Sequence, residues 1–137
     1  MRLVHGEFVD DCGAAALATW ASVSYDTAYD AIWPGEKPRE DRTCPECGSQ
    51  LSPHGTWPRQ ISRAIKRLGL GRWRYRRTND WTSIPNASIV CVAITENGAR
   101  MLHWLVKSRS GRMLCRVSPR KRKLPANYEV VGYLERA

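Results

Sequence analysis

The first part of the chain has the spacing and composition of helices. Residues 12–21 are rich in alanine, which favours a helix, and Asp10 and Asp11 suit the positive end of its dipole. Ser24 is placed to cap a second short helix, which the sequence predicts to stop before Pro34. We therefore expect two consecutive helices ahead of the rest of the domain.

A third helix is predicted after Thr56, which we expect to act as its N-cap, with Pro58 in the first turn. Its apolar positions fall at i, i+3, i+4 and i+7, the spacing that places side chains on one face of a helix. These positions are Ile61, Ala64, Ile65 and Leu68. Gly69 follows and is expected to end the helix.

Beyond the third helix the spacing changes to that of strands. Trp73 and Tyr75 alternate with arginines, and residues 88–95 form an almost continuous apolar run, typical of a central strand. Short turns are predicted at Asn97-Gly98 and Ser110-Gly111. The other predicted strands are residues 102–107, 112–117 and 130–134. Helices followed by an antiparallel sheet give an α+β fold.

The length of 137 residues fits one domain, and we expect residues 1–137 to fold around one core. A stretch rich in proline, glycine and charge, residues 34–56, is predicted to be a long inserted loop. Cys44 and Cys47 in this loop have the spacing of half a zinc knuckle, and His54 is a candidate third ligand. A structural zinc ion is one expectation, and a pair of reduced loop thiols is the other.

The cysteine count and the hydropathy pattern bear on location. The chain has five cysteines, an odd number, and its first residues lack the apolar stretch of a signal peptide. No apolar run reaches the roughly 18 residues that a membrane helix needs. We therefore expect a cytoplasmic protein without a membrane partner, in the host cytoplasm if a phage encodes it. Cys91 and Cys115 lie in strand patterns and are predicted to be packed thiols.

The net charge of +9 is concentrated in the second half of the chain. Residues 59–77 and 107–123 each contain eight basic side chains and no acid. Such a concentration of positive charge attracts nucleic acid and acidic protein surfaces. Residues 72–77 interleave arginines with aromatics, a pattern that suits single-stranded nucleic acid. It equally suits a strand with aromatics in the core and solvated arginines, which is the interpretation that we favour.

Cys12 occupies a position where a helix makes a thiol useful. The dipole and the unpaired N–H groups at a helix start favour the thiolate and can receive an oxyanion. Such chemistry also needs a base, and the chain has three histidines. His103 is the candidate, because it heads a predicted strand next to the central one. Two plainer interpretations stay open: a thiol packed in an alanine-rich helix, and a strand histidine bonded to the backbone.

A family resemblance starts at the same cysteine. Asp11-Cys12-Gly13-Ala14-Ala15-Ala16-Leu17 is similar to the Asp-Cys-Gly-x-Ala-x-Leu signature of the bacteriocin-processing (double-glycine leader) peptidase domains of ABC transporters. It also resembles small free-standing relatives in phages and bacteria. Weaker similarities follow in the family's order, over roughly residues 3–119 in all. They are Gly55-Thr56, Ile84-Pro85, His103-Trp104-Leu105-Val106 and Val117-Ser118-Pro119.

The resemblance implies a papain-like cysteine peptidase fold, with helices packed on an antiparallel sheet. It implies that Cys12 attacks a peptide or isopeptide of a protein substrate, while His103 deprotonates the thiol and later protonates the leaving amine. Two positions depart from the family, because Ser118 replaces the orienting Asp and Gly6 replaces the oxyanion-hole Gln. Both losses weaken the expected site. The candidate substitutes for the Asp are Asp80, Asn86 and Glu129.

These departures, together with the basic charge, also support a different function. In this second hypothesis the same fold is catalytically inactive and binds nucleic acid or an acidic protein through its basic face. The hypotheses differ in one chemical property. Only the first needs a Cys12 thiol that reacts at low pH and depends on His103.

Overall fold

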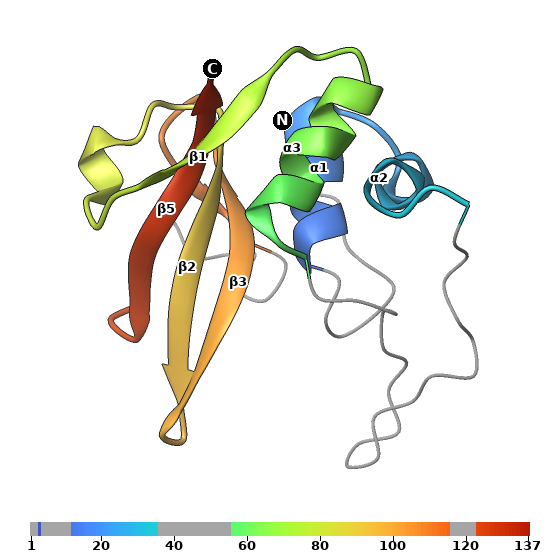
Figure 1. Ribbon diagram of the computed structural model, residues 1–137. Helices are drawn as coiled ribbons and strands as arrows, with labels where there is room; N and C mark the ends of the chain where they lie inside the picture. The colour runs from blue at the N-terminus through green and yellow to red at the C-terminus, as the bar shows by residue number, and fades with distance from the viewer. Residues whose placement is uncertain (1–2, 4–11, 36–55, 116–122) are drawn as a thin grey trace.

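A computed structural model describes residues 3, 12–35, 56–115 and 123–137 of the protein (Figure 1). Within them, helices precede a five-stranded antiparallel sheet with the order β1-β5-β2-β3-β4, which confirms the predicted α+β class. The helices are α1 (Cys12–Ala21), α2 (Tyr25–Ile32) and α3 (Pro58–Arg67). The strands are β1 (Trp73–Arg77), β2 (Ser88–Glu96), β3 (Ala99–Lys107), β4 (Met113–Leu114) and β5 (Tyr128–Arg136). A 3-10 turn, η1 (Trp81–Ser83), lies between β1 and β2.

The helix ends follow the sequence signals with one shift. The side chain of Ser24 accepts a hydrogen bond from the Thr27 N–H at 3.1 Å and caps α2, as predicted. The predicted cap of α3 is wrong by one residue, because Trp57 takes the cap position and its N–H donates to Gln60 Oε1 at 2.7 Å. Gly69, with a φ of 75°, ends α3 as predicted.

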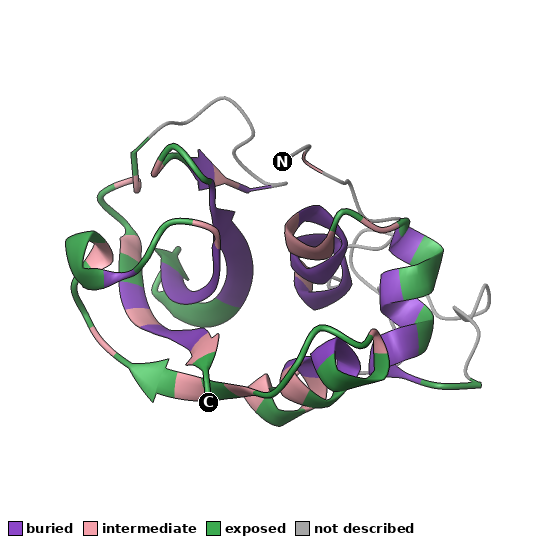
Figure 2. Cartoon of the chain, turned by 90° about the horizontal axis from the view of Figure 1, so that it is seen from above, coloured by how far each residue is buried: buried purple, intermediate pink, exposed green. Residues whose placement is uncertain are grey.

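The sheet carries a hydrophobic core on each face. The helices cover one face (Figure 1), and their core includes Ile89 and Cys91 of β2 with Trp104 and Val106 of β3. The second core takes the alternate residues Val90, Val92, Leu105, Val130 and Tyr133, together with Ile84, Ile94, Met113 and Cys115. β2 is therefore buried on both sides over most of its length (Figure 2), which is why its sequence is continuously apolar.

β1 separates aromatic from basic side chains at one edge of the sheet. Trp73 and Tyr75 pack against the helix-facing core, whereas Arg74 and Arg76 are exposed, which confirms the interpretation favoured from the sequence. Gly132 of β5 provides the space for Tyr75, because a Cβ atom at Gly132 would overlap the phenol ring. Burial is the main cause that raises the pKa of Tyr75 to about 12.

The other end of the sheet departs from the predicted boundaries. β3 begins at Ala99 rather than at residue 102, because Asn97 and Gly98, with φ of 51° and 78°, make the tight turn that lets it pair with β2 at once. β4 keeps only Met113 and Leu114 of the predicted 112–117 within the described residues. No helix in this described part of the chain is long and apolar enough to cross a membrane.

An unpredicted polar contact fastens η1 to the sheet. Lys107, at the end of β3, is only 6% exposed, and its Nζ donates to the carbonyls of Trp81 and Ile84 at 2.8 and 2.7 Å. The ammonium group also lies 5.1 Å from the centre of the Trp81 ring, within cation–π range. Burial lowers the pKa of Lys107, and the charge of Asp80 partly opposes that shift.

Candidate active site

Cys12 is the first residue of α1 and is partly exposed, while residues 13–19, which follow it in the helix, are buried. It lines a small cavity together with Trp104, Leu105 and Leu114 on the sheet side. Burial raises the pKa of Cys91 on β2 to about 12, and negative charge at Cys12 adds to the shift. Cys12 therefore lies at a helix start that faces β2 and β3.

A cysteine holds the imidazole of His103. Nε2 lies 3.1 Å from the Sγ atom of Cys115, and the two residues are 7% and 1% exposed. Cys115 directly follows β4, the neighbour of β3 in the sheet. A thiol can donate to a ring nitrogen or accept from it, so either tautomer of His103 can make this contact. Cys115 thus fixes the orientation of the ring.

Side chains of β3 alternate between the two cores. Trp104 joins the helix-facing core, against which Cys12 also packs, and Leu105 joins the second core, on the side of Cys115. His103 is two residues before Leu105, so its side chain points to the same face of the sheet as that of Leu105. Leu105 also lines the cavity at Cys12, but the imidazole of His103 lies on the Cys115 side of the strand, away from the core against which Cys12 packs. The structure brings Cys12 to the strand of His103 and attaches the imidazole itself to Cys115.

Thr56 connects the surroundings of the two candidate residues. The indole Nε1 of Trp104 donates to the Thr56 carbonyl at 3.0 Å. A Cβ atom on Gly13 would lie 2.5 to 2.6 Å from three atoms of the Thr56 side chain, so glycine is required there. The neighbour of His103 and the neighbour of Cys12 therefore both contact Thr56, a role that sequence reasoning missed by assigning Thr56 as a helix cap.

The candidate substitutes for the orienting acid have other partners. Asp80 caps η1, Asn86 donates to a loop carbonyl at 3.1 Å, and Glu129 forms a 3.9 Å ion pair with an arginine. Cys115 makes the contact with His103 instead. Sequence reasoning identified Cys115 as a buried thiol, which the structure confirms, but missed this contact.

The remaining predicted site residues lie outside the described residues, and their roles stay predictions. They are Gly6, Ser118 and the three zinc-ligand candidates Cys44, Cys47 and His54. Across the described ranges, no group of three or more His, Cys, Asp or Glu side chains is arranged to hold a metal ion.

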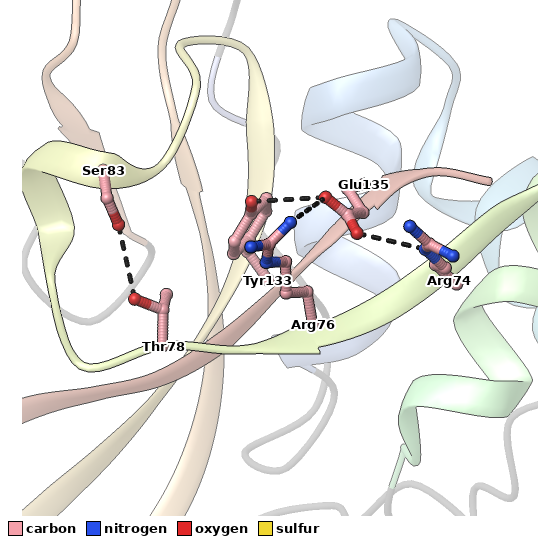
Figure 3. A network of polar contacts seen from close by, with 6 residues as sticks. All are labelled: Arg74, Arg76, Thr78, Ser83, Tyr133 and Glu135. Carbon is pink, nitrogen blue, oxygen red and sulfur yellow. Dashed lines mark hydrogen bonds and ion pairs between the residues drawn. The ribbon is translucent and has the colours of Figure 1, made fainter.

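The arginines of β1 surround an acid of β5 (Figure 3). Glu135 accepts from Arg74 at 3.0 Å, from Arg76 at 3.4 Å and from the Tyr133 hydroxyl at 3.4 Å. Burial opposes ionisation of Glu135, but the Arg74 hydrogen bond and both positive charges outweigh it and lower the pKa. The other exposed cations of α3, β1 and their connection are Arg59, Arg63, Lys66, Arg67, Arg72 and Arg77.

Comparisons with known proteins leave the site as the main guide to function. A scan against family models and searches of curated proteins and solved structures found no match. The resemblance to bacteriocin-processing peptidases therefore rests on the sequence motifs around Cys12 and His103.

Proposed function

We propose that this protein is a thiol-dependent peptidase with a papain-like fold, in which Cys12 is the nucleophile and His103 the general base. One observation carries the proposal: a partly exposed cysteine starts a helix beside the strand of a histidine whose ring is fixed by a hydrogen bond. A helix start favours the thiolate, and a fixed imidazole is what proton transfer requires. The chain order, cysteine before histidine, also agrees with the resembling family.

In the proposed reaction, His103 takes the proton of the Cys12 thiol, and the thiolate attacks the carbonyl carbon of an extended peptide. The imidazolium then protonates the leaving amine, and water hydrolyses the thioester with His103 again acting as base. Backbone N–H groups of the first turn of α1 are the donors proposed for the oxyanion.

The partner of His103 affects the expected rate. Cys115 can orient the ring, but a neutral thiol does not stabilise an imidazolium as a carboxylate does. Loss of the carboxylate in a catalytic triad lowers the rate by about 10⁴-fold without abolishing catalysis. We therefore expect slow turnover, and the reactivity of the nucleophile is a more sensitive first measurement than peptide hydrolysis.

The test measures alkylation of Cys12 by iodoacetamide at about pH 6, where a thiol with an ordinary pKa of about 8.5 reacts slowly. We expect fast stoichiometric labelling of the wild type, assigned to Cys12 by peptide mass spectrometry. The His103→Ala variant should label at least about tenfold more slowly, since the imidazolium no longer favours the thiolate. Met101→Ala, an exposed residue of the same strand, is the control and should label normally. Cys12 reacting no faster than free cysteine would refute the proposal.

The exposed arginines favour a second candidate function, in which an inactive papain-like fold binds nucleic acid or an acidic protein. The outward side chains of α3 and β1 are mostly guanidinium groups, which pair with phosphate in two-pronged hydrogen bonds. Affinity for single-stranded DNA and RNA should then fall steeply between about 50 and 200 mM salt. Arg63→Glu and Arg72→Glu should weaken the binding, and Cys12→Ser should leave it unchanged. Failure to bind either nucleic acid would leave an acidic protein as the partner in this candidate.

We also propose that Cys44 and Cys47, with His54, hold a structural zinc ion in the inserted loop. The chemistry of the donors supports it, because thiolate and imidazole are the ligands that structural zinc prefers. Metal analysis of the purified protein should find one equivalent of zinc, lost in Cys44→Ser. A protein purified in zinc-containing buffer and still free of the metal would contradict the assignment.

A further inference from the structure

We infer that Trp104 and Thr56 form a positioning pair that sets the first turn of α1, and with it Cys12, against β3. The inference rests on the proposed function, because it assigns a role at the same site. Neither residue touches the reacting atoms in the proposed reaction. Both act through their neighbours, so they are positioning residues.

The contacts form a short path between the nucleophile and the base. Trp104 follows His103 in β3, and its indole N–H donates to the Thr56 carbonyl at 3.0 Å. The Thr56 side chain in turn lies directly on Gly13, next to Cys12, at a distance that leaves no room for a Cβ atom. Trp104 also lines the cavity that Cys12 borders. Three segments distant in the sequence are thereby held in one arrangement.

The Thr56 hydroxyl shows which property of this residue matters. Its Oγ1 atom is buried and has no hydrogen-bond partner within the described part of the chain. Because the hydroxyl has no partner there, polar contacts do not hold the Thr56 side chain in place. Burying an unpaired hydroxyl in fact costs free energy. What remains is the shape of the side chain against Gly13 and the backbone carbonyl that Trp104 holds. The pair therefore works through packing and a single main-chain hydrogen bond.

A small displacement of Cys12 is enough to change its chemistry. Thiolate formation depends on the distances from the sulfur to the helix N–H groups and to the imidazole. A shift of about 1 Å in a catalytic group can cost about 100-fold in rate. Loosening the first turn of α1 should therefore alter the reactivity of Cys12 more than it alters the stability of the fold.

The test compares two tryptophan variants that lose the same kind of bond. Trp104→Phe removes the hydrogen bond to Thr56, and Trp20→Phe removes a matching indole bond to the Ala87 carbonyl at 2.9 Å, at the other end of α1. We expect Trp104→Phe to lower Cys12 alkylation at about pH 6 by about tenfold or more and to raise the midpoint of its pH profile. Trp20→Phe should stay within about twofold of the wild type, although both variants lose a partly buried indole hydrogen bond.

Two substitutions at Thr56 separate shape from polarity. Thr56→Val keeps the shape and the carbonyl, and should alkylate within about twofold of the wild type. Thr56→Gly removes the contact with Gly13 and should behave like Trp104→Phe. A Val variant that reacts as slowly as the Gly variant would overturn the assignment of a packing role.

Hydrogen exchange provides a readout that does not depend on catalysis. The amides of Ala16 and Leu17 close the first turn of α1, and their exchange should accelerate by about tenfold in Trp104→Phe but not in Trp20→Phe. Equal exchange and equal pH profiles in the two variants would overturn the positioning inference. If wild-type Cys12 shows no His103-dependent labelling, the proposed peptidase function fails instead, and the exchange measurement alone decides whether the pair fixes the helix.

Discussion

Replacing Cys115 by valine tests the hydrogen bond that holds His103. The substitution keeps a small apolar side chain at a position that is 1% exposed, but it removes the sulfur 3.1 Å from Nε2. A buried polar atom left without its partner costs about 1–3 kcal/mol. Small domains are stable by about 5–15 kcal/mol in total, so this loss is a sizeable fraction. We expect Cys115→Val to lower the free energy of unfolding by about 1–3 kcal/mol and the Tm by about 3–10 °C.

The same variant should slow the alkylation of Cys12, because the imidazole loses a contact that orients its ring. Cys115→Ser is the matched control, since serine retains one donor and two acceptor positions at a similar volume. Urea denaturation measures the stability, and mass spectrometry measures the alkylation rate at about pH 6. If the valine variant matches the wild type in both measurements, the contact with Cys115 contributes neither to folding nor to the site.

Three further predictions concern the scaffold. Gly132→Ala puts a methyl group on the ring of Tyr75 and should destabilise the protein by about 1–3 kcal/mol in urea denaturation, and an unchanged midpoint would show that the ring can move aside. Lys107→Met removes a hydrogen bond from each of two carbonyls near η1, although the Trp81 carbonyl keeps that of the Ile84 N–H. The loss at the Ile84 carbonyl alone costs about 1–3 kcal/mol, so thermal melting should fall clearly below that of the wild type, and equal melting would refute the role. Hydrogen bonds from Thr82 lower the pKa of Asp80, so the stability that Asp80 contributes is present above its unfolded pKa of about 3.9 and is lost as the pH falls through the folded value. An NMR titration of Asp80 with an ordinary pKa would contradict this.

The helical layer follows largely from local signals in the sequence. Ser24 caps α2 through its own side chain, and Gly69 ends α3 with the positive φ that glycine tolerates. The exception is Thr56, whose cap role was wrong because its side chain packs against Gly13 instead. Capping rules describe contacts within a few residues and cannot anticipate a tertiary contact between distant segments. The one clue in the sequence was Gly13, beside Cys12, because a residue without a side chain leaves room for another segment to pack closely.

The sheet could be predicted in outline but not at its edges. The apolar run of β2 marks a strand buried on both faces, and the turn at Asn97-Gly98 fixes the hairpin with β3. The short β4 and the turn η1 have weaker signals. They depend on polar contacts such as that of Lys107, whose long side chain places its charge on carbonyls of another segment. Nothing in the local sequence pattern distinguishes this buried lysine from the exposed Arg109 and Arg112 that follow it.

The face on which His103 lies illustrates a more general limit. Because β2 and β3 contribute apolar residues to both cores, hydrophobic pattern alone does not set the register of β3, and a slip of one residue would turn His103 to the helix side and Trp104 to the side of Cys115. Two polar contacts on opposite faces oppose such a slip. The indole of Trp104 donates to Thr56 on the helix side, and the ammonium group of Lys107 donates to the carbonyls near η1 on the other side. A shifted strand would break both at once. The register that positions His103 therefore depends on Trp104 and Lys107. A search for catalytic residue types would not select these two residues for that role.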